Sequence, residues 1–89
     1  MTEEGKLIGK ITHYFNKIGV AIIEITENEE LKIGDEIRIT GGNIDFIQKV
    51  ESMQIEHQPI EKAGKGDQVG VKVKEKVKEG NLVYKIVSS

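Results

Sequence analysis

The chain has 89 residues and a formal net charge of −2 at neutral pH, which fits a single domain and argues against a general nucleic-acid binder. It contains no cysteine, so disulfides, thiolate metal sites and cysteine nucleophiles are excluded. No apolar run approaches the ~18 residues that span a bilayer, and the acidic N-terminus lacks the order of a signal peptide, so we expect a soluble cytoplasmic protein.

Two strands are predicted near the N-terminus. The first, at residues 6–15, places three large apolar side chains on one side: Leu7, Ile11 and Phe15. Gly9 lies within this strand and indicates a bend or a close approach of two backbones. Residues 18–25 then form an almost continuous β-branched run. Such a run favours a strand that is covered on both faces.

A turn region and a hairpin are predicted next. Residues 26–34 are polar and too few to form a helix of consequence. Gly34 and Asp35 then turn the chain into a strand at residues 36–40, where apolar and polar side chains alternate. Residues 41–43 read Gly-Gly-Asn and close a hairpin, because glycine and asparagine tolerate the positive φ that such turns require.

The segment 44–60 changes the phase of its apolar alternation. Apolar residues up to Val50 share one parity, whereas those from Met53 onward share the other. Because a strand cannot change faces by itself, we expect a bulge or bend near residues 51–52. Pro59 lacks a backbone donor and is expected to end the ladder.

The last two strands are predicted at residues 68–74 and 82–87. The chain then has six short strands of regular spacing and no helix, which predicts an all-β, closed or nearly closed antiparallel barrel. Closure would remove the exposed edges that a sheet rich in isoleucine cannot leave open. We assign residues 6–87 to a single β-barrel domain, with tails at 1–5 and 88–89.

Four blocks of sequence resemble a known domain in their order and spacing. They are LKIGDEIRI at 31–39, VESMQIEH at 50–57, IEKAGKGDQVG at 60–70 and EGNLVYKI at 79–86. Together they resemble the second domain of the translational GTPases, which include elongation factor Tu, its archaeal and eukaryotic counterpart, and initiation factor 2. This resemblance implies a six-stranded antiparallel Greek-key β-barrel. The spacing is also similar to that of the C-terminal barrel of collagenase-like peptidases.

The resemblance to the GTPases implies where a partner would bind. In elongation factors this barrel helps to hold the aminoacylated 3′ end of tRNA, and Gln54 falls at the position of a glutamate that contacts the adenosine. A glutamine can also bond a ribose or a base edge. The second wall of that pocket would lie near Val69 and Gly70. The chain has no phosphate-binding loop of the P-loop type, so we expect neither GTP hydrolysis nor a bound nucleotide.

Glycine and aspartate occur together at two predicted turns, Gly34-Asp35 and Gly66-Asp67. Glycine gives the backbone freedom to turn a corner, and the aspartate carboxylate accepts backbone N–H bonds that hold the turn. Gly70 lies inside a predicted strand, where the missing side chain lets neighbouring strands approach. We therefore interpret these five residues as structural parts of the barrel.

The titratable side chains form no pattern that is typical of an active site. His13 and His57 are the only histidines, too few for a zinc site, and each is expected on a barrel face or rim. The serines lack the context of a nucleophile elbow. Acidic pairs such as Glu29-Glu30 lie in turn sequence, with no sign of a cleft. We expect no enzymatic activity, no metal and no cofactor.

Charge is distributed unevenly along the chain. Residues 1–61 carry −6 and residues 62–89 carry +4, and such asymmetry can mark a surface for a partner. The positive excess comes from lysines. Period-two spacing predicts Lys72 and Lys74 on one face of the barrel, with Lys76 and Lys78 continuing on the turn, and Lys62, Lys65 and Lys85 are expected nearby. They either contact phosphates or keep the outer face of a sheet soluble.

Two hypotheses of function follow. In the first, a non-enzymatic barrel contacts tRNA, other RNA or the ribosome through Gln54 and the lysines. In the second, the barrel is a protein-interaction module that serves an enzyme in trans, for example a collagenase-like peptidase. Neither a membrane nor a nucleotide is expected as a partner, and we expect a monomer or a weak dimer.

Overall fold

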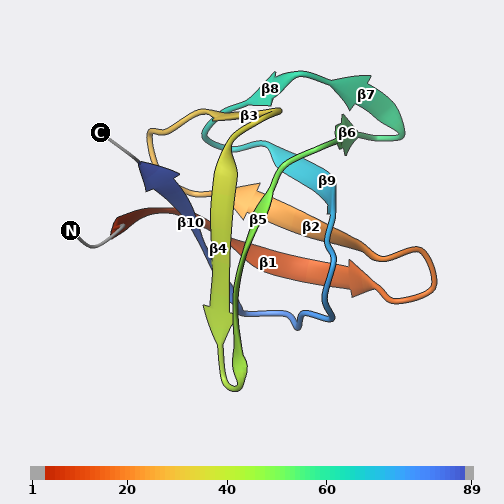
Figure 1. Cartoon of the computed structure of the whole chain (residues 1–89). Helices are drawn as coiled ribbons and strands as arrows, with labels where there is room; N and C mark the ends of the chain where they lie inside the picture. The colour runs from red at the N-terminus through yellow and green to blue at the C-terminus, as the bar shows by residue number, and fades with distance from the viewer. Residues whose placement is uncertain (1–3, 88–89) are drawn as a thin grey trace.

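The computed structural model describes residues 4–87, which form ten β-strands and no helix (Figure 1). The longer strands are β1 (Glu4–Phe15), β2 (Val20–Ile25), β4 (Glu36–Gly41), β5 (Ile44–Lys49), β9 (Gln68–Lys72) and β10 (Leu82–Val87). The short ones are β3 (Leu31–Lys32), β6 (Met53–Ile55), β7 (Gln58–Ile60) and β8 (Lys62–Ala63). The predicted all-β class is confirmed. Nothing in this part of the chain is a helix that could cross a membrane.

The longer strands lie where the alternation of apolar residues predicts them. β1 begins at Glu4, two residues before the predicted start of the domain. The rest of the predicted N-terminal tail, and the predicted tail at 88–89, lie outside the described residues. The predicted bend at residues 51–52 is confirmed, because β5 ends at Lys49 and β6 begins only at Met53.

The strands pair antiparallel in an open sheet. Its order is β5-β4-β10-β1-β2-β9-β6-β7, and β3 pairs with β8 in a second, small sheet. The predicted closed barrel of six Greek-key strands is therefore wrong in strand number and in closure. The bend at residues 50–52 is the physical reason. It splits one predicted strand into β5, which pairs with β4, and β6, which pairs with β9.

A side chain links the end strand β5 to the chain that follows β9. The amide nitrogen of Gln48 donates a hydrogen bond of 2.8 Å to the carbonyl oxygen of Lys72. Its Oε1 accepts a bond of 2.8 Å from the backbone N–H of Lys74. The carboxamide therefore offers one donor and one acceptor to the backbone, as a peptide group of a neighbouring strand would. Gln48 joins these two segments where the backbone ladder is missing.

The core is built almost entirely from aliphatic side chains. Among residues 4–87, Phe46 is the one aromatic residue that is buried in it. Branched side chains on alternate positions of a strand pack well against a facing sheet, which explains how a chain with few aromatics fills its interior. The largest side chains with less than 2% of their surface exposed are Ile8, Ile11, Ile23, Ile25, Leu31, Ile37, Ile39, Val50, Val69, Val71 and Val83.

The predicted facing of β1 is wrong at both ends of the strand. Ile8 and Ile11 are buried, whereas Leu7 and Phe15 are exposed. The register of β1 shifts between Leu7 and Gly9 against β10, and between Ile11 and His13 against β2. Each shift inserts a residue and exchanges the two faces. The close approach predicted at Gly9 is confirmed, because a methyl group there would overlap the carbonyl oxygen of Glu24.

Three turns of the same construction fix the corners of the sheet. We call residues 32–35, 64–67 and 78–81 the corner turns. In each, the third residue is a glycine with φ of 99°, 91° or 92°, respectively, a region that side chains disfavour. The fourth residue is Asp35, Asp67 or Asn81, and its side-chain oxygen accepts the backbone N–H of the first residue at 2.8, 2.9 or 2.8 Å.

Each corner turn is also fastened to a distant strand or strand end by a pair of backbone hydrogen bonds. The N–H groups of Gly34, Gly66 and Gly80 donate to the carbonyls of Val50, Ile25 and Ile11 at 2.8 Å. The N–H groups of Val50, Ile25 and Ile11 donate in return to the carbonyls of Asp35, Asp67 and Asn81. The structural role predicted for the two Gly-Asp pairs is confirmed, and a third pair, Gly80-Asn81, does the same work.

The β6–β7 hairpin extends beyond the rest of the sheet (Figure 1). Its turn consists of Glu56 and His57, with φ of 50° and 66°, values that are uncommon for residues other than glycine. Pro59 does not end the ladder as predicted. It lies within the edge strand β7, opposite Gln54, where a missing donor costs no ladder hydrogen bond on the outer side. His57 is exposed at the tip.

Candidate partner-binding surfaces

Gln54 lies on β6 directly opposite Gly70 of β9. A methyl group at Gly70 would stand 3.3 Å from Cγ of Gln54 and 3.3 Å from Cγ1 of Val20. The close approach predicted at Gly70 is therefore confirmed, with the Gln54 side chain packed over it. Val69 is fully buried, so it faces the core and cannot form the second wall of a surface pocket. Gly70 and Val20 flank Gln54 instead.

The predicted lysine face is only partly assembled. Lys72 ends β9, and Lys74, Lys76 and Lys78 follow in the irregular chain that leads to β10; all four are exposed. We call residues 72–78 the lysine segment. Val73 is 6% exposed and Val77 is 2% exposed, so these two valines anchor the segment to the core. Within residues 4–87, none of these four lysines forms an ion pair.

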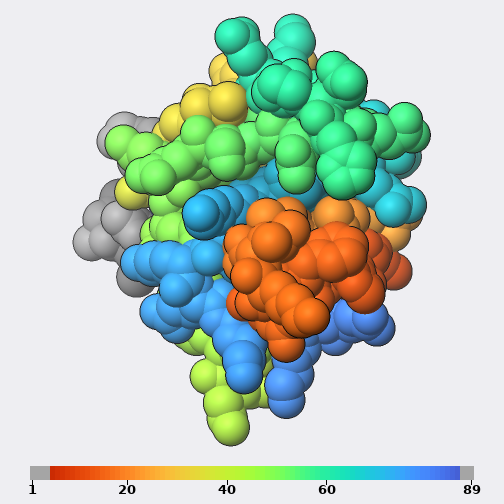
Figure 2. Space-filling model, turned by 90° about the vertical axis from the view of Figure 1, so that its right-hand side faces the viewer, coloured from red at the N-terminus to blue at the C-terminus, as the bar shows by residue number. Residues whose placement is uncertain are grey.

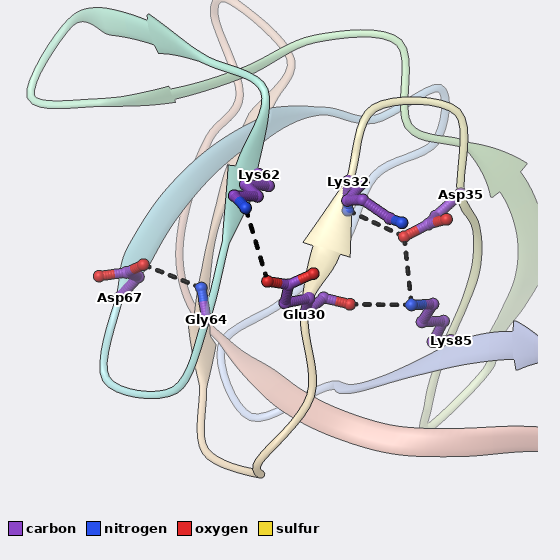
Figure 3. A network of polar contacts seen from close by, with 7 residues as sticks. All are labelled: Glu30, Lys32, Asp35, Lys62, Gly64, Asp67 and Lys85. Carbon is purple, nitrogen blue, oxygen red and sulfur yellow. Dashed lines mark hydrogen bonds and ion pairs between the residues drawn. The ribbon is translucent and has the colours of Figure 1, made fainter.

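Lys62, Lys65 and Lys85 lie away from the lysine segment. Lys65 is exposed in the corner turn between β8 and β9. Lys62 on β8 faces Glu30 with an Nζ–Oε2 distance of 3.9 Å. Lys85 Nζ donates to the carbonyl oxygen of Glu30 at 3.0 Å and lies 3.5 Å from the Asp35 carboxylate (Figure 3). Lys85 therefore contacts the corner turn at residues 32–35, and Lys62 pairs with Glu30.

Two hollows border the lysine segment. The first has a volume of about 390 Å³ and lies between the segment and the end of β5; its wall includes Lys49, Lys72, Lys74, Glu51 and Ser52. The second, of about 330 Å³, lies beside the β4–β5 turn; its wall includes Lys76, Lys78, Glu79, Asn43 and Ile44. Volumes of this size suit a side chain or a small ligand group. Both hollows carry more positive than negative charge.

The turn between β1 and β2 exposes apolar side chains beside the lysine segment. Phe15 is 44% exposed and Ile18 is 59% exposed. The N–H of Val73 donates to the carbonyl oxygen of Gly19 at 2.9 Å. Figure 2 shows this turn, in orange, next to the blue chain that follows β9. The Phe15 ring contacts the ring of His13 edge to face, with centroids 4.3 Å apart.

A second apolar surface crosses the outer face of four strands. Ile47, Arg38, Tyr84 and Leu7 lie opposite one another in register on β5, β4, β10 and β1. We call these four residues the apolar row. Leu7 and Ile47 are 37% and 38% exposed, and Leu82, two residues from Tyr84 on the same face, is 40% exposed. Exposed apolar side chains gathered in this way often mark an interface.

The arginine of the apolar row is held in a fixed position. Nε and one terminal nitrogen of Arg38 donate to the two carboxylate oxygens of Asp45 at 2.8 and 2.7 Å. These hydrogen bonds lower the pKa of Asp45 and raise the pKa of Arg38. Because a bidentate pair fixes the guanidinium plane, Arg38 presents a flat polar strip between Ile47 and Tyr84.

The histidine and acidic side chains of the described residues make surface contacts. Among residues 4–87, no cluster of three or more histidine or acidic side chains could hold a metal ion. His13 lies on the exposed part of β1, with Nδ1 3.5 Å from Oε2 of Glu79, and His57 lies at a hairpin tip. Glu30 forms an ion pair with Lys62, and Glu29 forms one with Lys6 at 2.8 Å. These side chains serve as surface and corner contacts.

Sequence reasoning missed several residues that shape the candidate surfaces. Gln48 is one such residue, because no signal in the sequence predicts that its side-chain amide forms a hydrogen bond with the backbone of Lys72. Lys49 belongs to the acidic half of the sequence, yet it lines a hollow with Lys72 and Lys74. Exposed Phe15 and Ile18 could have been found, because both flank the polar turn Asn16-Lys17.

The chain is similar over most of its length to collagenase-like peptidases. It is 46% identical over 85 residues to a collagenase of Porphyromonas gingivalis, a match that covers 94% of this chain and 23% of that protein. It is 44% identical over 78 residues to an uncharacterized protease of Methanocaldococcus jannaschii, covering 86% of this chain and 19% of that protein. The chain thus spans about a fifth to a quarter of the length of these relatives. No family model matches it.

The fold is also found in a solved structure. The C-terminal domain of a candidate U32 peptidase from Geobacillus thermoleovorans superimposes with a TM-score of 0.82 and 24% sequence identity, over 90% of this chain and 91% of that one. This match shows that the two share a fold. The predicted similarity to the C-terminal barrel of collagenase-like peptidases is therefore confirmed, whereas the resemblance to translational GTPases stays a prediction.

Proposed function

We propose that the chain is a non-catalytic accessory domain that works together with a collagenase-like peptidase. The observation that carries the proposal is the 46% identity over 85 residues to a segment that makes up 23% of a collagenase. The proposal assigns the chemical step to the peptidase, and residues 4–87 contain no cluster of three or more histidine or acidic side chains that could hold a metal ion.

The apolar row is a candidate contact surface for that partner. In a longer peptidase this domain lies in one chain with the remaining three-quarters of the protein, so the domain has a neighbour to pack against. Ile47, Arg38, Tyr84 and Leu7 form a band across four strands, and Leu82 extends it. Interfaces of this kind combine apolar contacts with an arginine that is already oriented. We propose that the apolar row faces the catalytic partner.

The RNA hypothesis draws its support from the lysine segment alone. Gln54 lies over Gly70 and is flanked by Val20, and Val69 is directed into the core. The three positions that the GTPase resemblance named do not combine into one polar pocket. The relatives reported above are peptidases, which favours the accessory role.

Affinity purification from the native host tests the proposal. We expect the tagged chain to retain one protein in high yield, identified by mass spectrometry as a collagenase-like peptidase. The double variant I47E/L82E places charge on the proposed contact face and should lose this protein. The variant I33E, which changes an isoleucine with a similar exposure of 45% in the corner turn that follows β3, should keep it. Recovery of tRNA or ribosomes without a peptidase would support the RNA hypothesis instead.

A further inference from the structure

We propose that the lysine segment and the β1–β2 turn together form a docking site for an acidic peptide that carries apolar residues between its carboxylates. The proposal deepens the accessory role and rests on it for the source of the peptide, which is a segment of the peptidase partner. The site itself lies apart from the apolar row, on chain that joins β9 to β10.

The lysines are available and their backbone is fixed. Lys72, Lys74, Lys76 and Lys78 are exposed and form no ion pair within residues 4–87. Buried Val73 and Val77 alternate with them and hold the backbone against the core. The Gln48 amide adds two hydrogen bonds of 2.8 Å around Val73. A rigid row of cations loses less conformational entropy on binding than a flexible loop does.

The lysines line two hollows in the surface. Lys49, Lys72 and Lys74 converge on the first, and Lys76 and Lys78 line the second. Each hollow holds one acidic residue, and Glu79 of the second is turned toward His13 at 3.5 Å. Both therefore present a net positive potential to a carboxylate. Two separate hollows along one segment fit two acidic side chains of an extended peptide, with intervening residues between them.

The β1–β2 turn supplies the apolar part of the site. Ile18 is 59% exposed and precedes Gly19, whose carbonyl oxygen accepts the N–H of Val73. An apolar residue on the peptide would cover Ile18 and Phe15 while its neighbours reach the lysines. Apolar contact of this kind supplies most of the affinity, and complementary charge sets orientation and the rate of association.

The observations favour a peptide over a nucleic acid. Residues 1–61 carry a charge of −6, so a long polyanion that extends beyond the lysine segment meets repulsion, whereas a short peptide can remain on the segment. Ile18, the most exposed apolar residue of the site, offers no ring for a base to stack on.

Fluorescence anisotropy on the purified chain tests the site without any peptidase. The probe is a labelled octapeptide of alternating glutamate and leucine, at about 50 mM salt. We expect saturable binding that weakens about tenfold or more in K72E/K74E, because each reversal replaces an attraction with a repulsion. K10E/K65E changes the charge equally at two exposed lysines elsewhere and should change binding less than about twofold. I18S should weaken binding with little effect on its salt dependence.

Three outcomes would overturn the proposal. One is absence of binding to the octapeptide. Another is an equal loss in K72E/K74E and K10E/K65E, which would mean a general charge effect. The third is tighter binding to a uridine octanucleotide or to phosphatidylserine vesicles than to the peptide. If the octapeptide binds but affinity purification recovers no peptidase, the accessory role fails while the site stands; recovery of a peptidase with no peptide binding means the reverse.

Discussion

At the scale of single residues, the corner turns explain why this short sequence has so many glycines in polar surroundings. Gly66 adopts φ of 91° and its N–H donates to Ile25, so its conformation and its hydrogen bond are both used. Asp67 then accepts the N–H of Gly64 at 2.9 Å. The pair holds the end of β2 and the start of β9 together.

The variant G66A should lower the free energy of unfolding by about 1–2 kcal/mol, because alanine disfavours a positive φ. Urea denaturation followed by circular dichroism measures this change. Gly64 is a matched control in the same turn. Its φ is not positive and a methyl group there meets no atom within 4 Å. G64A should be neutral or up to about 1 kcal/mol more stable; equal destabilisation by both variants would contradict the role given to Gly66.

The sequence predicts a turn at all three corners, but it predicts the shared construction for only two of them, and the reason is chemical. Gly34-Asp35 and Gly66-Asp67 repeat the same two letters, whereas the third pair is Gly80-Asn81. The amide oxygen of asparagine accepts the same backbone N–H bond as a carboxylate. A search for Gly followed by either residue, with an alternating strand after it, would have found all three.

At the scale of elements, the turn of the β6–β7 hairpin has backbone dihedral angles that its residue types disfavour. Glu56 and His57 adopt the left-handed conformation that two-residue hairpin turns require, although asparagine and glycine suit it better. The sequence Glu-His gives no turn signal, so the hairpin could not be predicted from residue types. It forms because β6 pairs with β9 on one side and with β7 on the other.

Replacing the turn with E56N/H57G should raise the free energy of unfolding by about 1 kcal/mol, because two residues that strain the turn are removed. Chemical denaturation measures the gain. The reversed variant E56G/H57N has the same composition but puts glycine and asparagine in the less favourable order, so it should gain less. A loss of stability in E56N/H57G would show that the Glu56 or His57 side chain makes a contact that holds the hairpin.

Strand positions were more predictable than strand faces. The alternation of apolar residues places the longer strands correctly, because burial of one face imposes a period of two. The faces of β1 were wrong because two register shifts lie inside it. A shift depends on the strands that pair on either side, and those partners, β2 and β10, come from opposite ends of the sequence. The short strands β3 and β8 were missed for a different reason: a strand of two residues is too short to show an alternation of apolar and polar side chains.

At the scale of the whole molecule, the fold places lysines that are close in the sequence on different parts of the surface. Lys62, Lys65 and Lys85 belong to the same positive part of the sequence, residues 62–89, as the lysine segment, yet Lys62 pairs with Glu30 and Lys85 contacts Glu30 and Asp35. Lys49 joins the segment from the negative half. The order of residues in the sequence therefore predicts that this surface is positively charged, and only the tertiary structure shows which lysines lie on it.

The most direct test of the accessory role uses the Porphyromonas gingivalis collagenase, 46% identical over 85 residues. The matching segment is deleted, or it is replaced by this chain, and peptide hydrolysis is measured for both proteins and for the intact enzyme. If the chain is an equivalent accessory domain, deletion should abolish most of the activity and the graft should restore most of it, with I47E/L82E in the graft removing the benefit. A graft that is soluble and rich in β-structure, yet no more active than the deletion, would contradict the account.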